Sequence, residues 1–209
     1  MKIYDWHIAP NPRRLHIYLA EKGLQIPLEE VGGDNLKLKP SYVEKYPHAM
    51  VPVLELDDGT LIGEAMAICR YFEELHPNPP LMGTDAKDKA IVEMQEKRAN
   101  EEGMLAASEL FRNTHPSFAN RGLPGSAEAI QQHPYLVERA KARLARFYRK
   151  FDTQLANNEF VAGKRYTIAD ATKLCAIDFG KWTDLDIPPE CKHLRRWYDA
   201  VSARPSAKA

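Results

Sequence analysis

The side chains best suited to nucleophilic or metal chemistry in this 209-residue chain are three cysteines and seven histidines. Cys69, Cys175 and Cys191 are far apart and odd in number, so the chain lacks a CxxC pair and a disulfide framework. The histidines are never closer than nine residues, which excludes the HxxxH spacing of a helical metal site. Cys69 and Cys175 stand among apolar neighbours, which favours buried, inert thiols. The sequence therefore predicts three structural cysteines and no metal.

Two expected helix starts offer backbone N–H groups to an anion. Asn11 is a good N-cap and Pro12 suits a first helical position, so we expect a helix over 12–22 that is capped by Asn11. Glu64-Ala65 opens another helix, whose first N–H groups have no internal partner and could hold a carboxylate. The alternative is that Glu64 is only a favourable acid at a helix start.

Strands and helices are both expected over the first 80 residues, and they would position the two helix starts. The patterns predict a strand at 2–6, the helix at 12–22 and a second strand at 26–31. Asp57-Asp58-Gly59 predicts a tight turn in a hairpin over 51–63, and a helix follows over 65–75. A βαβ half joined to a ββα half makes a small mixed sheet with helices on its faces.

The rest of the chain is expected to be all helical. A proline-rich linker at 76–85 precedes four segments of helical periodicity, at 87–113, 136–157, 167–182 and 194–204. A long loop at 115–134 interrupts them, and loops of that length are often functional. We expect two domains, 1–80 and 86–209. Thr167 and Asp170 form a capping box whose role is folding.

The composition excludes several classes of protein. Hydrophobic residues make up 44% and charged residues 28% of the chain, which is typical of a globular protein. Lysine plus arginine, at 29, balances aspartate plus glutamate, at 29, so we expect no nucleic-acid partner. The absence of an apolar run of about 18 residues argues against a membrane partner. The start, MKIYDWHIAP, lacks the apolar stretch of a signal peptide, which predicts a cytoplasmic protein.

Three segments carry a resemblance to a known family. They are APNPRRLHIYLAEKG at 9–23, VPVLELDDGTLIGEAMAICRYFEE at 51–74 and FVAGKRYTIADA at 160–171. In this order they resemble the cytosolic glutathione transferases, and the resemblance spans nearly the whole chain. It implies an α/β plus all-α fold, in which a thioredoxin-like N-terminal domain (βαβ-ββα) is followed by a C-terminal helical bundle.

The resemblance implies a glutathione site in the first domain. In the family a cis-proline, here Pro52, exposes the backbone of the preceding residue, here Val51, to pair with glutathione like an added strand; an ordinary edge-strand proline is the alternative. The helix start at Glu64 and Ala65 would hold the γ-glutamyl carboxylate. Family members usually have serine or threonine where Ala65 stands, so one hydroxyl donor is missing.

Further residues follow from the same resemblance. Lys37 or Lys39 would meet the glycine carboxylate of glutathione, unless both are solvated loop lysines. The hydroxyl or thiol that usually activates glutathione is absent, because Ala9 stands near that place. Asn11 then becomes the leading donor to the thiolate, with capping alone as the alternative. Ser108 could act through a water, unless it bonds only to a backbone carbonyl.

The electrophile is expected to lie against the helical domain. The candidate contacts are His7, Leu105, Phe111, Arg112 and His115, although His7 could simply face solvent. The implied activity is transfer of the glutathione thiolate to a small electrophile, as in detoxification, by a homodimer that uses glutathione as co-substrate. The alternative is a weakly catalytic or chaperone-like binding module, which Ala9 and Ala65 favour. A disulfide reductase would need a cysteine near residues 9–13.

Overall fold

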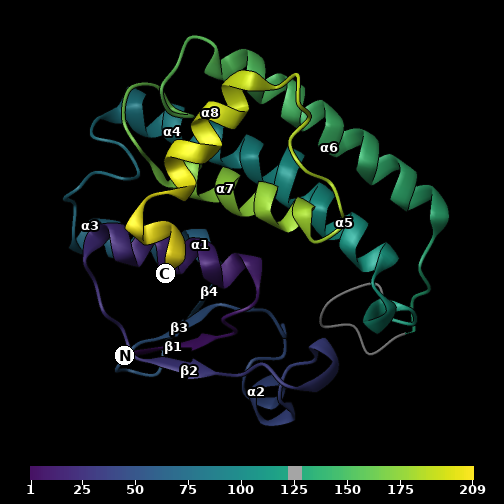
Figure 1. Cartoon of the computed structure of the whole chain (residues 1–209). Helices are drawn as coiled ribbons and strands as arrows, with labels where there is room; N and C mark the ends of the chain where they lie inside the picture. The colour runs from purple at the N-terminus through teal and green to yellow at the C-terminus, as the bar shows by residue number, and fades with distance from the viewer. Residues whose placement is uncertain (122–128) are drawn as a thin grey trace.

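The computed structural model describes residues 1–121 and 129–209, and it has two parts that meet mainly along the helix Pro10–Lys22 (Figure 1). The first part is a four-stranded sheet in the order β2-β1-β3-β4, with β1 and β2 parallel and the other neighbours antiparallel. Its elements are β1 Lys2–Asp5, α1 Pro10–Lys22, β2 Leu28–Glu30, α2 Pro40–Lys45, β3 Val53–Glu55, β4 Leu61–Gly63 and α3 Ala65–Leu75. The predicted βαβ and ββα halves are confirmed.

The sequence patterns predicted neither α2 nor a short 3₁₀ turn at Asp34–Leu36, both of which lie between β2 and β3. The sheet has a buried face on each side because successive side chains of a strand alternate. Ile3 and Leu54 belong to the main core with α1 and α3, whereas Tyr4 and Val53 pack with Tyr42 of α2 in a second cluster. Figure 1 shows α2 across the sheet from α1 and α3.

The second part is helical, as predicted. Its helices are α4 Ala86–Arg98, α5 Leu105–Thr114, α6 Pro134–Leu155, α7 Ile168–Lys181 and α8 Lys192–Ser202, with 3₁₀ turns at Pro116–Phe118 and Pro205–Lys208. The helix expected over 87–113 contains a π-helical turn, Ala99–Met104, between α4 and α5. Residues 122–128 of the loop expected at 115–134 lie outside the described residues.

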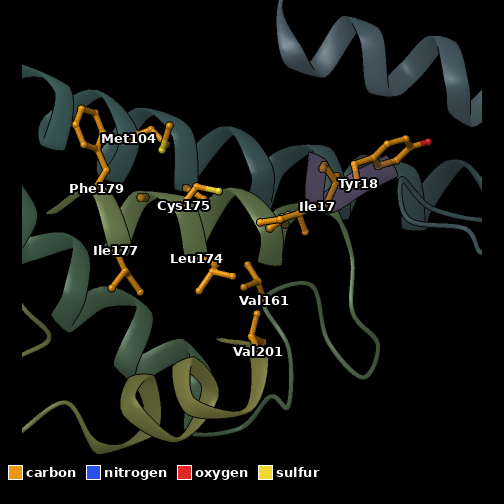
Figure 2. Close-up of a cluster of buried hydrophobic side chains, with 14 of the residues drawn as sticks. Ile17, Tyr18, Met104, Val161, Leu174, Cys175, Ile177, Phe179 and Val201 are labelled. Atoms are coloured by element: carbon orange, nitrogen blue, oxygen red, sulfur yellow. The ribbon is translucent and has the colours of Figure 1, made fainter. Parts of the chain in front are cut away.

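Helix α7 is the centre of the helical core. Figure 2 shows Leu174, Cys175 and Ile177 of α7 among side chains from several other elements. Its first turn is held by Asp170, whose carboxylate accepts from the Thr167 N–H at 2.9 Å and from the Thr167 hydroxyl at 3.1 Å. The predicted folding role of this pair is therefore consistent with the structure.

All three cysteines are buried and free, which confirms the predicted burial of Cys69 and Cys175. Burial raises the pKa of the Cys69 thiol, and it raises the pKa of the Cys175 thiol to about 11. Thiols with raised pKa values are poor nucleophiles at neutral pH, because the thiolate is the reactive form.

No described helix is long and apolar enough to cross a membrane.

Candidate active site

The register of the sheet brings four segments to one edge. Tyr4 pairs with Val53 and Val53 pairs with Gly63, so the end of β1 lies beside the start of β3 and the end of β4. Asp5 pairs with Glu30 in the parallel ladder, so β2 ends at the same edge. The segments that meet there are the β1–α1 loop, the loop after β2, the Val51-Pro52 step and the N-terminus of α3.

Asn11 is not the N-cap of α1, contrary to the sequence prediction. The helix begins at Pro10, and Ala9 occupies the cap position with extended backbone and no side-chain cap bond. The sequence allowed the helix to start at Pro10 or at Pro12, because proline lacks the backbone N–H that the first turn of a helix leaves unpaired. The Asn11 side chain instead accepts a hydrogen bond through Oδ1 from Arg14 Nη2 at 2.8 Å.

Arg14 joins Asn11 to the helical part. Its Nη1 donates to Glu96 Oε1 on α4 at 3.2 Å and to Asn100 Oδ1 at 3.0 Å. Thr172 of α7 also donates to Glu96 Oε1, at 3.1 Å. Arg14 and Glu96 are each 4% exposed, and burial raises the pKa of Glu96 although the charge of Arg14 opposes the shift.

Sequence reasoning missed this network. The one local signal was the i, i+3 spacing of Asn11 and Arg14, which places both side chains on one face of a helix. The partners on the other part of the molecule are more than 80 positions away from Arg14, and no pattern in the sequence pairs them.

The Val51-Pro52 peptide bond is cis, as the resemblance implied. Among the described residues, the backbone N–H and C=O of Val51 make no backbone hydrogen bond. Continuing the ladder from Val53 and Gly63 places Val51 opposite the start of α3. An unpaired backbone step therefore lies next to a helix N-terminus.

At that terminus, Glu64 is exposed and has the positive φ of 65°, which is uncommon for a residue other than glycine. Ala65, the first helical residue, is 2% exposed. The first backbone donor with a partner inside the helix is the Ile68 N–H, which bonds to the Glu64 carbonyl at 3.1 Å. The N–H groups before it are therefore available to a ligand.

The two candidate lysines differ in their surroundings. Lys39 Nζ donates to the backbone carbonyl of Glu30 at 2.6 Å, so one of its N–H groups is used within the chain. Lys37 is exposed, and its ammonium has no hydrogen-bond partner in the described part of the chain. Lys37 is therefore the freer cation of the two.

His7 faces a carboxylate rather than the helical part. Its side chain is 72% exposed, and Nδ1 lies 3.0 Å from Glu30 Oε2. Partial burial opposes the ionisation of Glu30, but hydrogen bonds from His7 and from the Gly32 N–H outweigh it and lower the pKa of that carboxyl. The solvent-side alternative for His7 thus fits better than contact with an electrophile.

Two of the predicted electrophile contacts belong to an aromatic cluster. The Phe111 ring lies 4.8 Å from the His115 ring and 5.6 Å from that of Phe118, between ring centroids. From α7 and its end, Phe179 and Trp182 lie 5.4 and 5.8 Å from Phe111. Sequence reasoning missed Phe118, Phe179 and Trp182; the helical spacing of Phe179 and Trp182 was the available signal.

The other predicted residues of α5 are less enclosed. Leu105 is 50% exposed, and Ser108 is half-buried. Within residues 1–121 and 129–209 the Ser108 hydroxyl makes no hydrogen bond to a backbone carbonyl, and its role stays a prediction. Burial lowers the pKa of the half-buried Arg112 guanidinium.

Arg121 ties the aromatic cluster to the loop after β2. Its guanidinium lies 4.5 Å from the Phe118 ring centroid. The same group donates to the backbone carbonyls of Asn35 at 2.5 Å and Leu36 at 2.8 Å. The rings therefore lie across from the loop that carries Lys37, so the two halves of the candidate site face each other.

The comparisons with known proteins agree with this geometry. A family model for the glutathione S-transferase N-terminal domain matches residues 3–80, and one for the glutathione S-transferase C-terminal domain matches residues 104–205. Glutathione S-transferase 2 of Saccharomyces cerevisiae is 37% identical over 100% of this chain and 88% of its own length.

Two solved structures are similar over nearly their whole length. The crystal structure of Gtt2 from Saccharomyces cerevisiae has a TM-score of 0.87 and 33% identity, covering 100% of this chain and 99% of the other. A glutathione S-transferase domain-containing protein from Marinobacter aquaeolei has a TM-score of 0.85 and 36% identity, covering 99% of each chain. The chain therefore belongs to the glutathione S-transferase family.

Proposed function

We propose that the protein transfers the thiolate of glutathione to a small electrophile. The observation that carries the proposal is the meeting, at one edge of the sheet, of the unpaired Val51 backbone and the free N–H groups of α3. An extended peptide with a carboxylate at one end matches both features. The thioredoxin-like part (residues 1–80) would bind glutathione, and the helical part (residues 86–209) would receive the electrophile.

Each end of glutathione has a complementary group in this proposal. The cysteinyl backbone pairs with Val51 as an added strand does at a free edge. The γ-glutamyl carboxylate accepts from the N–H groups at Ala65 and Met66, where the helix dipole also favours an anion. Lys37 pairs with the glycine carboxylate, and Lys39 has the weaker claim because it bonds to Glu30.

Asn11 is the proposed donor to the thiolate. A free cysteine thiol has a pKa near 8.5, so reaction at neutral pH requires its pKa to fall by about one to two units. The Asn11 carboxamide has its oxygen against Arg14, which leaves the two N–H bonds of Nδ2 to point elsewhere. A donor beside sulfur, together with the N-terminus of α1, would stabilise the thiolate. Ser108 would assist through a bound water.

The electrophile is proposed to lie against the aromatic cluster of Phe111, His115, Phe118, Phe179 and Trp182. Trp182 is 52% exposed, so the cluster offers an apolar surface to a ligand. Arg112 and Leu105 would extend that surface along α5. Binding both reactants in one cleft turns a bimolecular reaction into an effectively unimolecular one, which is the expected main source of rate.

The test compares two substitutions of Asn11 by calorimetry and by thiolate absorbance against pH. Asn11→Asp retains an oxygen for Arg14 but loses both amide donors and adds a negative charge. We expect it to bind S-methylglutathione normally and to raise the pKa of bound glutathione. Asn11→Ala should raise this pKa less, because it adds no charge. Absence of glutathione binding to the unaltered protein would refute the proposed function, and binding without turnover would favour a non-catalytic module.

We also propose a homodimer. A groove of about 560 Å³ lies between α3 and α4, and it is lined by the apolar residues Met66, Ala67 and Ala90 together with charged ones. Met94, a further residue of α4, is 40% exposed. Such a surface fits a second copy, with the first part of one subunit against the helical part of the other. Sedimentation that gives a monomer at micromolar concentration would refute the dimer.

A further inference from the structure

The orientation of the Asn11 carboxamide is set by the chemistry of its neighbour. An arginine guanidinium has five N–H donors and no acceptor, so the atom of Asn11 that faces Arg14 Nη2 at 2.8 Å must be the oxygen. The same argument applies to Asn100, whose Oδ1 lies 3.0 Å from Arg14 Nη1. Two carboxamides are thereby oriented by one buried side chain.

Arg14 is itself held in place from the helical part. Its side chain is 5% exposed and pairs with Glu96, whose side chain is also 5% exposed. Thr172 adds a hydrogen bond to the same carboxylate oxygen at 3.1 Å. A planar guanidinium held by Glu96 of α4 and Asn100 of the π-helical turn has little freedom to rotate, and Thr172 of α7 fixes Glu96 in turn, so the remaining N–H groups of Arg14 have a fixed direction.

We propose that Arg14 is a positioning residue that holds the Asn11 amide group in the orientation that stabilises the glutathione thiolate. This inference rests on the proposed function. Without Arg14, the carboxamide could turn and present its oxygen to sulfur, which would repel the thiolate instead of donating to it. The helical part would then control thiol activation in the thioredoxin-like part through the contacts of Glu96 and Asn100 with Arg14.

The role of Arg14 differs from that of Arg13, its neighbour in the sequence. Arg13 pairs with Asp178 at 2.7 Å and donates to the Ala207 carbonyl at 3.2 Å, and neither contact involves Asn11. Arg13 and Arg14 thus both join α1 to the helical part, but only Arg14 contacts the proposed thiolate donor. Arg13→Lys is therefore the matched control for Arg14→Lys.

The experiment measures the pKa of bound glutathione, by thiolate absorbance, in six proteins. Four are the unaltered protein, Arg14→Lys, Asn11→Ala and the double variant of these two substitutions; the control proteins are Arg13→Lys alone and Arg13→Lys combined with Asn11→Ala. Lysine retains the positive charge, but its single ammonium cannot reproduce the planar fork. Arg14→Lys should raise the thiol pKa by up to about one unit, which is a tenfold loss of thiolate well below the pKa. Affinity for S-methylglutathione, which has no thiol to ionise, should stay within about twofold.

The double variant separates positioning from direct electrostatics. If Arg14 acts through Asn11, Arg14→Lys should add nothing to the thiol pKa once Asn11 is alanine. Arg13→Lys should leave the pKa unchanged in both backgrounds. An equal rise with and without Asn11, or no rise in the presence of Asn11, would overturn the inference while leaving the proposed function intact.

Two further outcomes are informative. If Asn11→Ala does not change the thiol pKa, then Asn11 is not the thiolate donor, and both this inference and that part of the proposed function are wrong. If Arg14→Lys fails to fold, Glu96→Gln takes its place, because it keeps the shape of the side chain while removing the charge that anchors Nη1. It should raise the thiol pKa in the presence of Asn11 and not in the Asn11→Ala background, and any other result overturns the inference.

Discussion

At the scale of single residues, the proposed glutathione site depends on which side chain stands at the first position of α3. Alanine and serine both fit the backbone there, but alanine has no hydroxyl, and the residue is Ala65. It is the first residue of α3 and is 2% exposed, so its methyl group lies next to the proposed γ-glutamyl site without offering a donor. The backbone N–H groups of the same turn would have to hold the carboxylate alone.

Ala65→Ser should therefore tighten glutathione binding. A hydrogen bond to a charged group contributes about 1.5 to 3 kcal/mol, or roughly ten- to a hundredfold in Kd. Isothermal titration of the two proteins measures the difference. Ala86→Ser is the control, because Ala86 is also the first residue of a helix, α4, but is exposed and lies outside the proposed site. An unchanged Kd for Ala65→Ser would mean that another group already satisfies the carboxylate.

At the scale of elements, β3 is tied to its neighbours by one carboxylate. Glu55 accepts from Lys45 Nζ of α2 at 2.8 Å and from the Tyr4 hydroxyl of β1 at 2.5 Å. These hydrogen bonds, first from Lys45 and then from Tyr4, lower the pKa of Glu55 from 4.5 to about 2. The folded state therefore binds the proton less tightly than the unfolded state does.

The consequence is a pH-dependent contribution to stability. Because the folded pKa is the lower one, the contribution is present above about pH 4.5 and is lost as the pH falls towards 2. Glu55→Gln should lower the melting temperature at pH 7 and have progressively less effect between pH 5 and pH 2. Lys45→Met should show the same window, since it removes the other partner. A pH-independent difference would contradict this assignment.

The π-helical turn between α4 and α5 depends on Gly103. A Cβ atom at this position would lie 2.6 Å from the Phe147 ring and 2.9 Å from Ala176 Cβ, so α6 and α7 would have to move apart. Gly103→Ala should cost about 1 to 3 kcal/mol, the usual range for overpacking. Thermal unfolding measures it, with Glu101→Ala as an exposed control on the same turn. A stability equal to that of the unaltered protein would mean that the helices adjust freely.

At the scale of the whole molecule, a buried carboxylate anchors the segment that joins the two parts. Glu73 of α3 accepts from the Tyr18 hydroxyl at 2.7 Å and from the Met82 N–H at 3.0 Å, and it pairs with Lys22 at 2.7 Å. Lys22 also donates to the His76 and Pro79 carbonyls. The proline-rich connection is thus fixed against α1 and α3.

Glu73→Ala should destabilise the whole molecule. It leaves Lys22 and Tyr18 without their shared acceptor, and loss of one member of a buried ion pair costs about 3 to 5 kcal/mol. Chemical denaturation measures the loss, and limited proteolysis should cut within residues 76–85 sooner than in the unaltered protein. Glu74→Ala is the exposed neighbouring control. Faster proteolysis without a change in stability would assign Glu73 to the connection alone.

The sequence by itself determined the order of the elements, because its signals are local. Strand alternation, the Asp-Gly turn and helical periodicity need only neighbours along the chain, and they predicted the βαβ–ββα unit and the helical part. The resemblance carried by the motif around Val51-Pro52 implied a glutathione site there, and that site stays a prediction. Helix α2 was missed because six residues between turns provide too little periodicity to recognise.

Only the tertiary structure decided what the side chains of these elements contact. Asn11 has the local signature of a cap, but its oxygen binds Arg14, which is held by Glu96 from another part of the molecule. The contact between the Phe111 and Trp182 rings likewise joins two segments that are distant in the sequence, α5 and the end of α7. Such contacts depend on how helices distant in sequence pack together, and packing maximises burial and hydrogen bonding over the whole chain rather than within any one segment.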